Sequence, residues 1–276
     1  MKEIIIVFIA TLFLTACGAN VQEPQLVEVT ATVTETSTPT LEPTATITAT
    51  MAETQIPTTR PTKVKTSTPD VPQEVVRFLT EDEFTIVGSI LGDGKVAVIL
   101  THMGEAGSDS RNSWIPFARY AAADGVFTFL AIDFRSYGAS VGERSFSNQK
   151  LDILGAIKFL QERGYEKFVC MGASMGGNAC IEAALMYPDL IGLAVIASDP
   201  RIDRDYSGLL MPKLFVLEEG DPYGLTERME TVYELMPDPK EYHTFPENVH
   251  GTRMFKTESG DAFRALLLDY LDSLVQ

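Results

Sequence analysis

From residue 74 onward the chain alternates between two patterns of apolar residues. Short continuous apolar runs, of which residues 95–101 are the clearest, are typical of strands buried on both faces of a sheet. Longer segments such as residues 151–163 carry apolar residues at helical spacing. The pattern predicts strands at residues 74–80, 84–91, 95–101, 127–134, 167–172, 192–197, 213–217 and 241–245, and helices at 113–123, 151–163, 176–186, 225–235 and 262–275.

This order of elements favours one fold class. Strands that alternate with helices build a mostly parallel, doubly wound α/β sheet. The first two strands are separated only by residues 81–83, so they predict an antiparallel entry hairpin. We therefore expect residues 73–276 to form one α/β domain.

The first residues of the chain have the pattern of a targeting segment. Lys2 precedes an apolar run at residues 4–14, which is shorter than the roughly 20 residues of a membrane-spanning helix and is typical of a signal peptide. Residues 14–18, Leu-Thr-Ala-Cys-Gly, resemble the lipobox of bacterial lipoproteins. That resemblance implies that residues 1–16 are removed and that Cys17 is lipidated, with acyl chains such as palmitate holding the protein on the extracytoplasmic face of the cell membrane. The alternative is an ordinary secretory signal.

Residues 17–72 differ sharply in composition from the rest. Residues 18–72 contain 16 Thr and 7 Pro and no Phe, Trp or Tyr. Such a segment buries too little apolar surface to offset its ordering entropy, which predicts a disordered linker. We interpret it as a spacer between membrane and domain, with an O-glycosylated stalk or a segment that binds the cell wall as alternatives.

Charge and cysteine content exclude several classes of partner. The chain has 22 basic and 38 acidic residues, a net charge of -16, which argues against nucleic acid and against electrostatic binding to an anionic membrane. Cys170 and Cys180 are expected to be buried small hydrophobic residues. A disulfide between them is the alternative in an oxidising compartment, but the sequence does not indicate one. No Cys and His spacing indicates a metal site, and no Gly-rich phosphate loop indicates a cofactor.

The candidate nucleophile is Ser174. Residues 172–177 read Gly-Ala-Ser-Met-Gly-Gly and stand between a predicted strand and a predicted helix, which is the context that the G-x-S-x-G motif requires. A serine on this tight turn needs neighbours without bulk. The turn also aims the first amides of the helix at the space beside the serine oxygen, where an anion would develop.

With this motif, the element order of residues 73–276 resembles the α/β-hydrolase superfamily, near its small esterase and dienelactone-hydrolase-like members. The resemblance implies a catalytic triad in the chain order Ser, acid, His, and an oxyanion loop after an early strand. Many relatives insert a helical cap between the strands that correspond here to residues 192–197 and 213–217. This chain has room for a single turn or short helix around residues 203–210, so we expect a minimal cap and an open, shallow site.

The base and the acid are assigned through this resemblance. The family base follows the last strand, which indicates His250, whereas His243 lies within that strand and is expected to be structural. The acid follows the preceding strand, where the Gly-Asp pair at 220–221 favours Asp221. The acid would orient the histidine and stabilise the imidazolium. Three alternatives for the acid remain open at this stage: Glu218, Glu219 and Asp199.

The oxyanion loop is predicted at residues 102–107, which begin with His102. The family usually has His-Gly there, but this chain has Met103 in place of that glycine. The resemblance implies that the backbone amides of Gly104 and Met175 bind the oxyanion. Residues 133–140 resemble a further family loop and are expected to act as scaffold, and Trp114 is expected to lie in the core or in the pocket wall.

Together these features predict a membrane-anchored, extracytoplasmic serine hydrolase that cleaves carboxylic esters through an acyl-enzyme and needs no cofactor. Its partners would be a small-molecule ester or acyl substrate and the membrane. A serine peptidase of the same fold and a non-catalytic binding lipoprotein are the alternatives.

Overall fold

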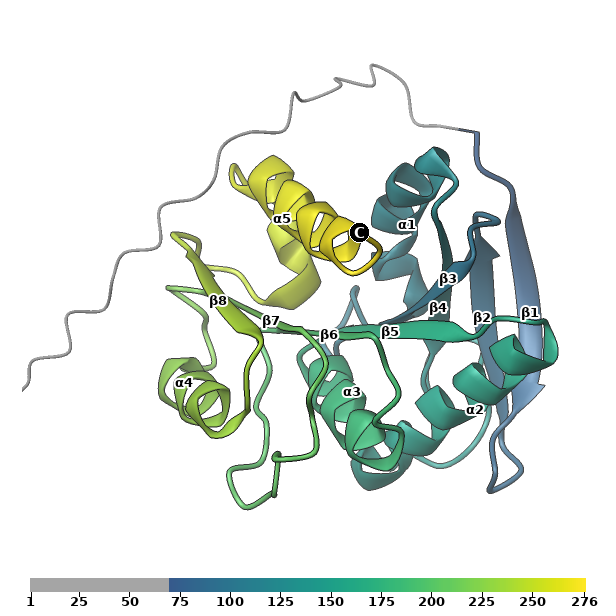
Figure 1. The fold of residues 1–276 in the computed structure, drawn as a ribbon, viewed down its shortest axis with the longest axis horizontal. Helices are drawn as coiled ribbons and strands as arrows, with labels where there is room; N and C mark the ends of the chain where they lie inside the picture. Colours follow the sequence, from purple (N-terminus) through teal and green to yellow (C-terminus); the bar gives the residue numbers. More distant parts are fainter. Residues whose placement is uncertain (1–69) are drawn as a thin grey trace, which may run out of the picture. The chain divides into compact units, whose positions relative to one another are not determined.

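The computed structural model describes residues 70–276, which are coloured by sequence position in Figure 1. The predicted signal peptide at residues 1–16, the lipidation site Cys17 and the predicted linker up to residue 69 lie outside the described residues.

The centre of the fold is a sheet of eight strands in the order β1-β2-β4-β3-β5-β6-β7-β8. The strand order runs outward from β3 in both directions, which makes the sheet doubly wound and confirms the predicted fold class. The strands are β1 (Gln73–Leu79), β2 (Thr85–Leu91), β3 (Val96–Thr101), β4 (Phe127–Asp133), β5 (Lys167–Ala173), β6 (Gly192–Ile196), β7 (Lys213–Glu218) and β8 (Lys240–Phe245).

Two kinds of pairing divide the sheet. β1 pairs antiparallel with β2, in a register that places Gln73 opposite Leu91, and β2 pairs antiparallel with β4. All pairs from β4 through β3 and β5 to β8 are parallel. The carboxyl ends of β3, β5, β7 and β8 therefore lie along the same edge of the sheet, where doubly wound folds bind their ligands.

Helices cover both faces of the sheet (Figure 1). α1 (Ile115–Ala121) and α5 (Gly260–Ser273) lie on one face, and α2 (Gln149–Glu162), α3 (Met175–Met186) and α4 (Thr226–Leu235) lie on the other. These helices match the predicted ones to within a few residues. The structure adds four short 3₁₀ segments, which are too short to show a helical period in the sequence: η1 (Arg111–Ser113), η2 (Ala122–Asp124), η3 (Phe146–Asn148) and η4 (Gly251–Lys256).

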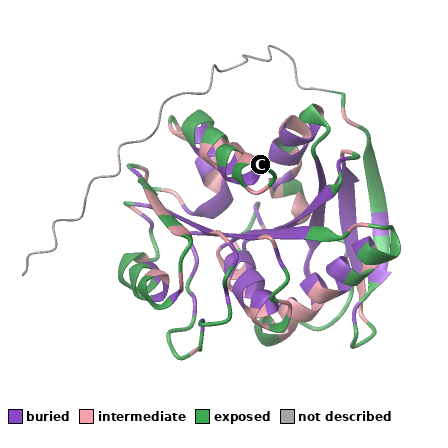
Figure 2. Ribbon diagram, viewed as in Figure 1, coloured by how far each residue is buried: buried purple, intermediate pink, exposed green. Residues whose placement is uncertain are grey.

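Burial explains the two apolar patterns. Every residue of β3, β4, β6 and β7 is buried, as expected for parallel strands covered on both faces. β1 forms one edge of the sheet and is mostly exposed (Figure 2), with only Val76 and Phe78 buried. The continuous apolar runs thus correspond to the interior of the sheet.

The structure corrects the interpretation of the two domain cysteines. Cys170 and Cys180 are both fully buried, as expected, but they form a disulfide, with their Cα atoms 5.7 Å apart. Cys170 lies on β5 and Cys180 on α3. The tight turn between these elements sends α3 back along β5 and brings the two residues together, a juxtaposition that sequence spacing alone does not reveal.

The segment between β6 and β7 contains turns and no helix within residues 197–212. One of these turns is closed by a hydrogen bond from the Leu209 amide to the Tyr206 carbonyl at 3.0 Å. Of the two predicted possibilities, a single turn or a short helix, the structure therefore has the turn.

Candidate active site

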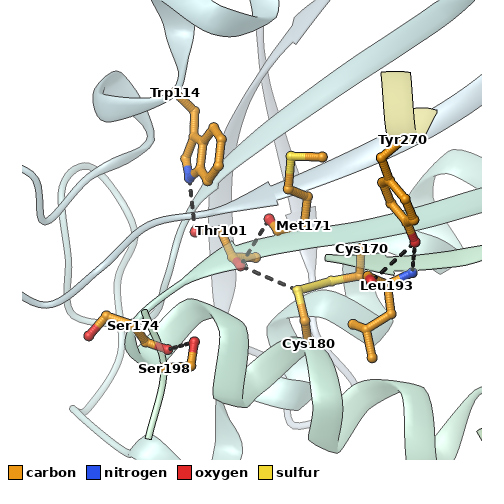
Figure 3. Close-up of a disulfide and its surroundings, with 9 residues drawn as sticks. All are labelled: Thr101, Trp114, Cys170, Met171, Ser174, Cys180, Leu193, Ser198 and Tyr270. Atoms are coloured by element: carbon orange, nitrogen blue, oxygen red, sulfur yellow. Dashed lines mark hydrogen bonds between the residues drawn. A yellow bond between two sulfur atoms is a disulfide. The ribbon is translucent and has the colours of Figure 1, made fainter. Parts of the chain in front are cut away.

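Ser174 occupies the tight turn between β5 and α3. Its backbone has φ 55° and ψ -122°, a strained conformation for a residue with a side chain. Two contacts with the end of β6 hold it: the Ser174 amide donates to the Ile196 carbonyl at 2.8 Å, and the Ser198 hydroxyl donates to the Ser174 carbonyl at 3.0 Å (Figure 3). Sequence reasoning missed Ser198, because nothing in the pattern pairs it with a residue 24 positions earlier.

The glycines around Ser174 are required by close backbone approach. A Cβ at Gly172 would lie 2.4 Å from the Gly176 carbonyl, and one at Gly176 would lie 2.6 Å from the Thr101 carbonyl. At Gly177 a Cβ would lie 2.0 Å from the Ser198 hydroxyl oxygen. The turn can therefore pack against β3 and the end of β6 only because these three positions lack side chains.

The disulfide flanks this turn. It joins the strand before Ser174 to the helix after it, and the Thr101 hydroxyl lies 3.4 Å from the Cys180 sulfur (Figure 3). The disulfide thus restrains the two elements that flank the turn, and hydrogen bonds restrain Ser174 itself.

His250 and Asp221 are in direct contact. The His250 Nδ1 and Asp221 Oδ2 atoms are 2.6 Å apart, and both side chains are almost fully buried. Asp221 Oδ1 accepts a second hydrogen bond from the Tyr223 amide at 2.9 Å. With Nδ1–H donated to the carboxylate, Nε2 is the ring nitrogen left free to exchange a proton.

The ring of Tyr223 forms one wall beside this histidine. Its centroid lies 4.5 Å from that of His250 in an edge-to-face arrangement. Sequence reasoning missed Tyr223, since an aromatic residue after Asp221-Pro222 has no distinguishing signal.

None of the three alternative acids forms a hydrogen bond or ion pair with His250. Asp199 is exposed and pairs with Arg228 at 2.6 Å, and Glu219 is exposed and accepts a hydrogen bond from Thr244 at 3.3 Å. Glu218 is fully buried, and neither of its oxygens has a hydrogen-bond partner among residues 70–276. Burial, with a smaller contribution from the charge of Asp221, raises the pKa of Glu218 to about 8, which favours the protonated, neutral carboxyl. Asp221 is therefore the carboxylate that the fold brings to His250.

The two predicted oxyanion residues lie side by side. A Cβ at Gly104 would lie 3.1 Å from the Met175 sulfur, and Met175 is the first residue of α3, where backbone amides have no partner within the helix. The Met175 sulfur also accepts a hydrogen bond from the Gln149 side-chain Nε2 at 3.4 Å. Both predicted donors therefore belong to one small region beside Ser174.

Met103 is accommodated by the loop that follows His250. Its side chain is fully buried, and its sulfur accepts a hydrogen bond from the Thr252 hydroxyl at 3.3 Å. The residue that departs from the family pattern therefore packs beneath the His250 loop.

His102 anchors the oxyanion loop rather than facing the site. Its Nδ1–H donates to the Met103 carbonyl at 2.8 Å, and its Nε2 accepts from the Phe134 amide at 3.0 Å. Both bonds fit a neutral imidazole, and burial lowers the pKa of His102 from its ordinary value. This histidine joins the loop after β3 to the end of β4.

Residues 133–140 also act as scaffold, as predicted. The Arg135 guanidinium donates to Asp152 at 2.7 Å and to Asp82 at 2.6 Å, and so joins α2 to the entry hairpin. Asp133 accepts from the Arg111 amide at 2.7 Å. The buried charges of Arg135, Asp152 and Asp133 are all paired, which is the condition under which buried ions are tolerated.

The remaining predicted positions are structural. Trp114 is fully buried in the core, and its indole N–H donates to the Thr101 carbonyl at 2.9 Å. His243 lies in β8, with its Nε2 atom 3.2 Å from a carboxylate oxygen of Glu241.

A single cleft of about 810 Å³ is lined by the candidate nucleophile and the candidate base. Ser174, His250, Gly104 and Met175 all line it, and Tyr223 forms part of its wall. Its volume lies toward the upper end of the range of small-molecule sites. A serine, an oriented imidazole and free amides around one cleft can together support nucleophilic attack on a carbonyl carbon.

Residues 70–276 contain neither a metal-binding cluster nor a membrane-spanning helix. No three or more His, Cys, Asp or Glu residues cluster there in a way that could hold a metal ion. Within the same residues, no helix has the length and apolar character needed to cross a bilayer.

Comparison with known proteins identifies the fold. The family described as the alpha/beta hydrolase fold matches residues 97–216. None of the curated protein sequences compared with the chain matches it. Among solved structures, an esterase of Pyrococcus furiosus is 15% identical, with 74% of this chain and 93% of that chain covered and a TM-score of 0.62.

Two further solved esterases are similar to the same extent. The thermophilic esterase of Thermogutta terrifontis, solved with malate bound, is 17% identical, with 73% of this chain and 99% of that chain covered and a TM-score of 0.60. The esterase of Exiguobacterium antarcticum is 14% identical, with 72% and 100% covered and a TM-score of 0.60. At these identities the similarity is one of fold.

Proposed function

Because the described domain has the α/β-hydrolase fold, we propose that this protein is a serine hydrolase that cleaves carboxylic esters through an acyl-enzyme intermediate. The observation that carries the proposal is the 2.6 Å hydrogen bond between His250 and Asp221, with His250 lining the same cleft as the strained Ser174. The three similar esterases favour an ester as the substrate class.

In the first half of the reaction, Ser174 attacks the ester carbonyl carbon. His250 Nε2 takes the hydroxyl proton as the Oγ–C bond forms, and Asp221 stabilises the resulting imidazolium. The negative charge that moves to the carbonyl oxygen is bound by the backbone amides of Gly104 and Met175. When the intermediate collapses, His250 returns the proton to the leaving oxygen, and an alcohol departs from the acylated Ser174.

The second half repeats these steps with water. His250 removes a proton from a water molecule that attacks the acyl carbon, and the same amides bind the second oxyanion. Collapse releases the carboxylic acid and returns the proton to Ser174. One imidazole thus serves as base and acid in turn, and its orientation by Asp221 matters in both halves.

The location of the protein is part of the proposal. The lipobox-like residues 14–18 support lipidation of Cys17, and the Thr- and Pro-rich residues 18–72 support a spacer between membrane and enzyme. Disulfides are typical of proteins that fold in oxidising compartments. The Cys170–Cys180 disulfide therefore favours the extracytoplasmic side.

The test is hydrolysis of 4-nitrophenyl butyrate by the full chain, with Ser174→Ala as the matched variant. We expect turnover by the parent and a loss of at least about 10³-fold in the variant, with circular dichroism showing that both are folded. A matched 4-nitroanilide substrate tests the peptidase alternative. If the parent neither hydrolyses the ester nor reacts with a fluorophosphonate at Ser174, the enzyme proposal is wrong and the binding lipoprotein is favoured.

A further inference from the structure

More basic than acidic side chains line the cleft. Besides His250, the charged residues that line it are the acids Glu105, Glu182 and Asp199 and the bases Arg144, Lys150, Arg201 and Arg204. Which of these charges are available to a substrate depends on their existing ion pairs.

All three acids are already paired. Glu105 contacts Arg253 at 2.5 Å, Glu182 contacts Arg204 at 2.9 Å, and Asp199 contacts Arg228 at 2.6 Å. Each negative charge that lines the cleft is therefore neutralised by a neighbouring arginine.

Two of the four bases are paired as well, Arg204 through Glu182 and Arg201 through Asp203 at 2.5 Å. Arg144 and Lys150 differ from them. Among residues 70–276, no carboxylate oxygen lies within 4.0 Å of either side-chain cation. The cleft therefore presents two positive charges without a protein counter-ion.

Both of these cations line the same cleft as the predicted oxyanion residues. The Arg144 guanidinium carbon lies 4.8 Å from the centroid of the Tyr137 ring, and the Tyr137 hydroxyl lies 3.8 Å from where a Cβ of Gly104 would be. Lys150 directly follows Gln149, whose side-chain amide donates to the Met175 sulfur. Stacking on a buried tyrosine restricts Arg144 and leaves the N–H edges of its guanidinium free to bind a planar anion.

We propose that Arg144 and Lys150, termed here the cation pair, form a binding site for a carboxylate on the substrate, so that the preferred substrate is an ester that carries a second, ionised carboxyl group. This inference rests on the proposed function, because it uses the same cleft. The whole chain carries a net charge of -16, and its overall field repels anions. A preference for an anionic ester therefore requires local cations of this kind.

The test compares two esters of equal carbon number, mono-(4-nitrophenyl) adipate and 4-nitrophenyl hexanoate, with the full chain as enzyme. The quantity measured is the ratio of their kcat/KM values. We expect the variant Arg144→Gln/Lys150→Gln to lower the adipate-to-hexanoate ratio by about threefold to tenfold, as expected for two partly exposed ion pairs. The change should lie in the KM of the adipate ester, and 0.5 M salt should lower the ratio of the parent in the same direction.

The matched control is Arg77→Gln/Lys158→Gln, which removes the same net charge. Both residues are exposed and lie outside the cleft lining, and Lys158 is on the same helix as Lys150. The control should leave the ratio unchanged. An unchanged ratio in the cation-pair variant, or an equal change in the control, would overturn the inference. In either case, hydrolysis of the hexanoate ester would still support the proposed function. Hydrolysis of neither ester would overturn both.

Discussion

Met103 packs against Gly251, with its sulfur 3.1 Å from the position that a Cβ on Gly251 would occupy. Met103 belongs to the predicted oxyanion loop, and Gly251 directly follows the candidate base His250. A methionine at the position where the family usually has glycine therefore links the two loops, and the missing side chain of Gly251 makes room for it.

The first prediction concerns this contact. Gly251 has φ 56°, and an added Cβ would also lie 3.3 Å from the Cβ of Ala173. Gly251→Ala should displace His250 and lower kcat by about 10- to 100-fold, because small misplacements of catalytic groups are costly. Steady-state kinetics on 4-nitrophenyl butyrate and thermal unfolding measure the two effects.

Gly164→Ala is the matched control for Gly251→Ala. Gly164 also has positive φ, 89°, but an added Cβ would meet nothing within 4 Å. It should lose about 1 kcal/mol of stability from backbone strain and keep the parent kcat. A Gly251→Ala protein with the parent kcat would contradict the proposed link between the loops.

The second prediction separates the two buried carboxyls near His250. Asp221→Asn should lower kcat by about 10³- to 10⁴-fold, because an amide in that position can favour the wrong histidine tautomer. Glu218→Gln should lower kcat by less than about tenfold, since Glu218 makes no hydrogen bond to the histidine. Comparable losses in the two folded variants would mean that the assignment of the acid is wrong.

The third prediction concerns stability against pH. The pKa of Glu218 is raised from 4.5 to about 8, mainly by burial. Between these values the folded protein holds a proton that the unfolded chain has released, so raising the pH favours unfolding. This contribution of Glu218 is constant below the window, falls by up to about 1.4 kcal/mol per pH unit within it, and is constant again above it.

Glu218→Gln should remove this dependence, so its free energy of unfolding relative to the parent should rise between pH 5 and pH 8. Urea unfolding at several pH values measures this difference. Glu219→Gln is the control, because Glu219 is the next residue but is exposed. If both variants follow the pH profile of the parent, Glu218 does not titrate in this window.

The fourth prediction concerns the disulfide. Cys170→Ala/Cys180→Ala should lower the free energy of unfolding by about 2–3 kcal/mol, because a crosslink over a short loop restricts the unfolded chain. Unfolding and refolding the parent with a thiol reductant should lower its Tm, whereas the double variant should not respond. A parent that keeps its Tm after reduction would show that the bond contributes nothing to stability.

Local pattern was sufficient to predict the order of the elements. The continuous apolar runs matched the buried strands, because a strand covered on both faces needs apolar side chains at every position. The glycines around Ser174 indicated a tight turn for an equally local reason. The chain order of Ser174, Asp221 and His250 followed from the family resemblance, and their catalytic roles stay predictions.

Contacts between distant segments were decided only by the tertiary structure. Asp221, Glu218 and Glu219 occupy nearly the same place in the sequence, but only Asp221 contacts His250, because side-chain direction at the end of β7 depends on how β8 and its loop pack. The tertiary structure likewise decided three further features: the disulfide, the contact between Met103 and Gly251, and the unpaired charges of Arg144 and Lys150. Each depends on which side chains the folded sheet brings together, and sequence periodicity carries no information about that.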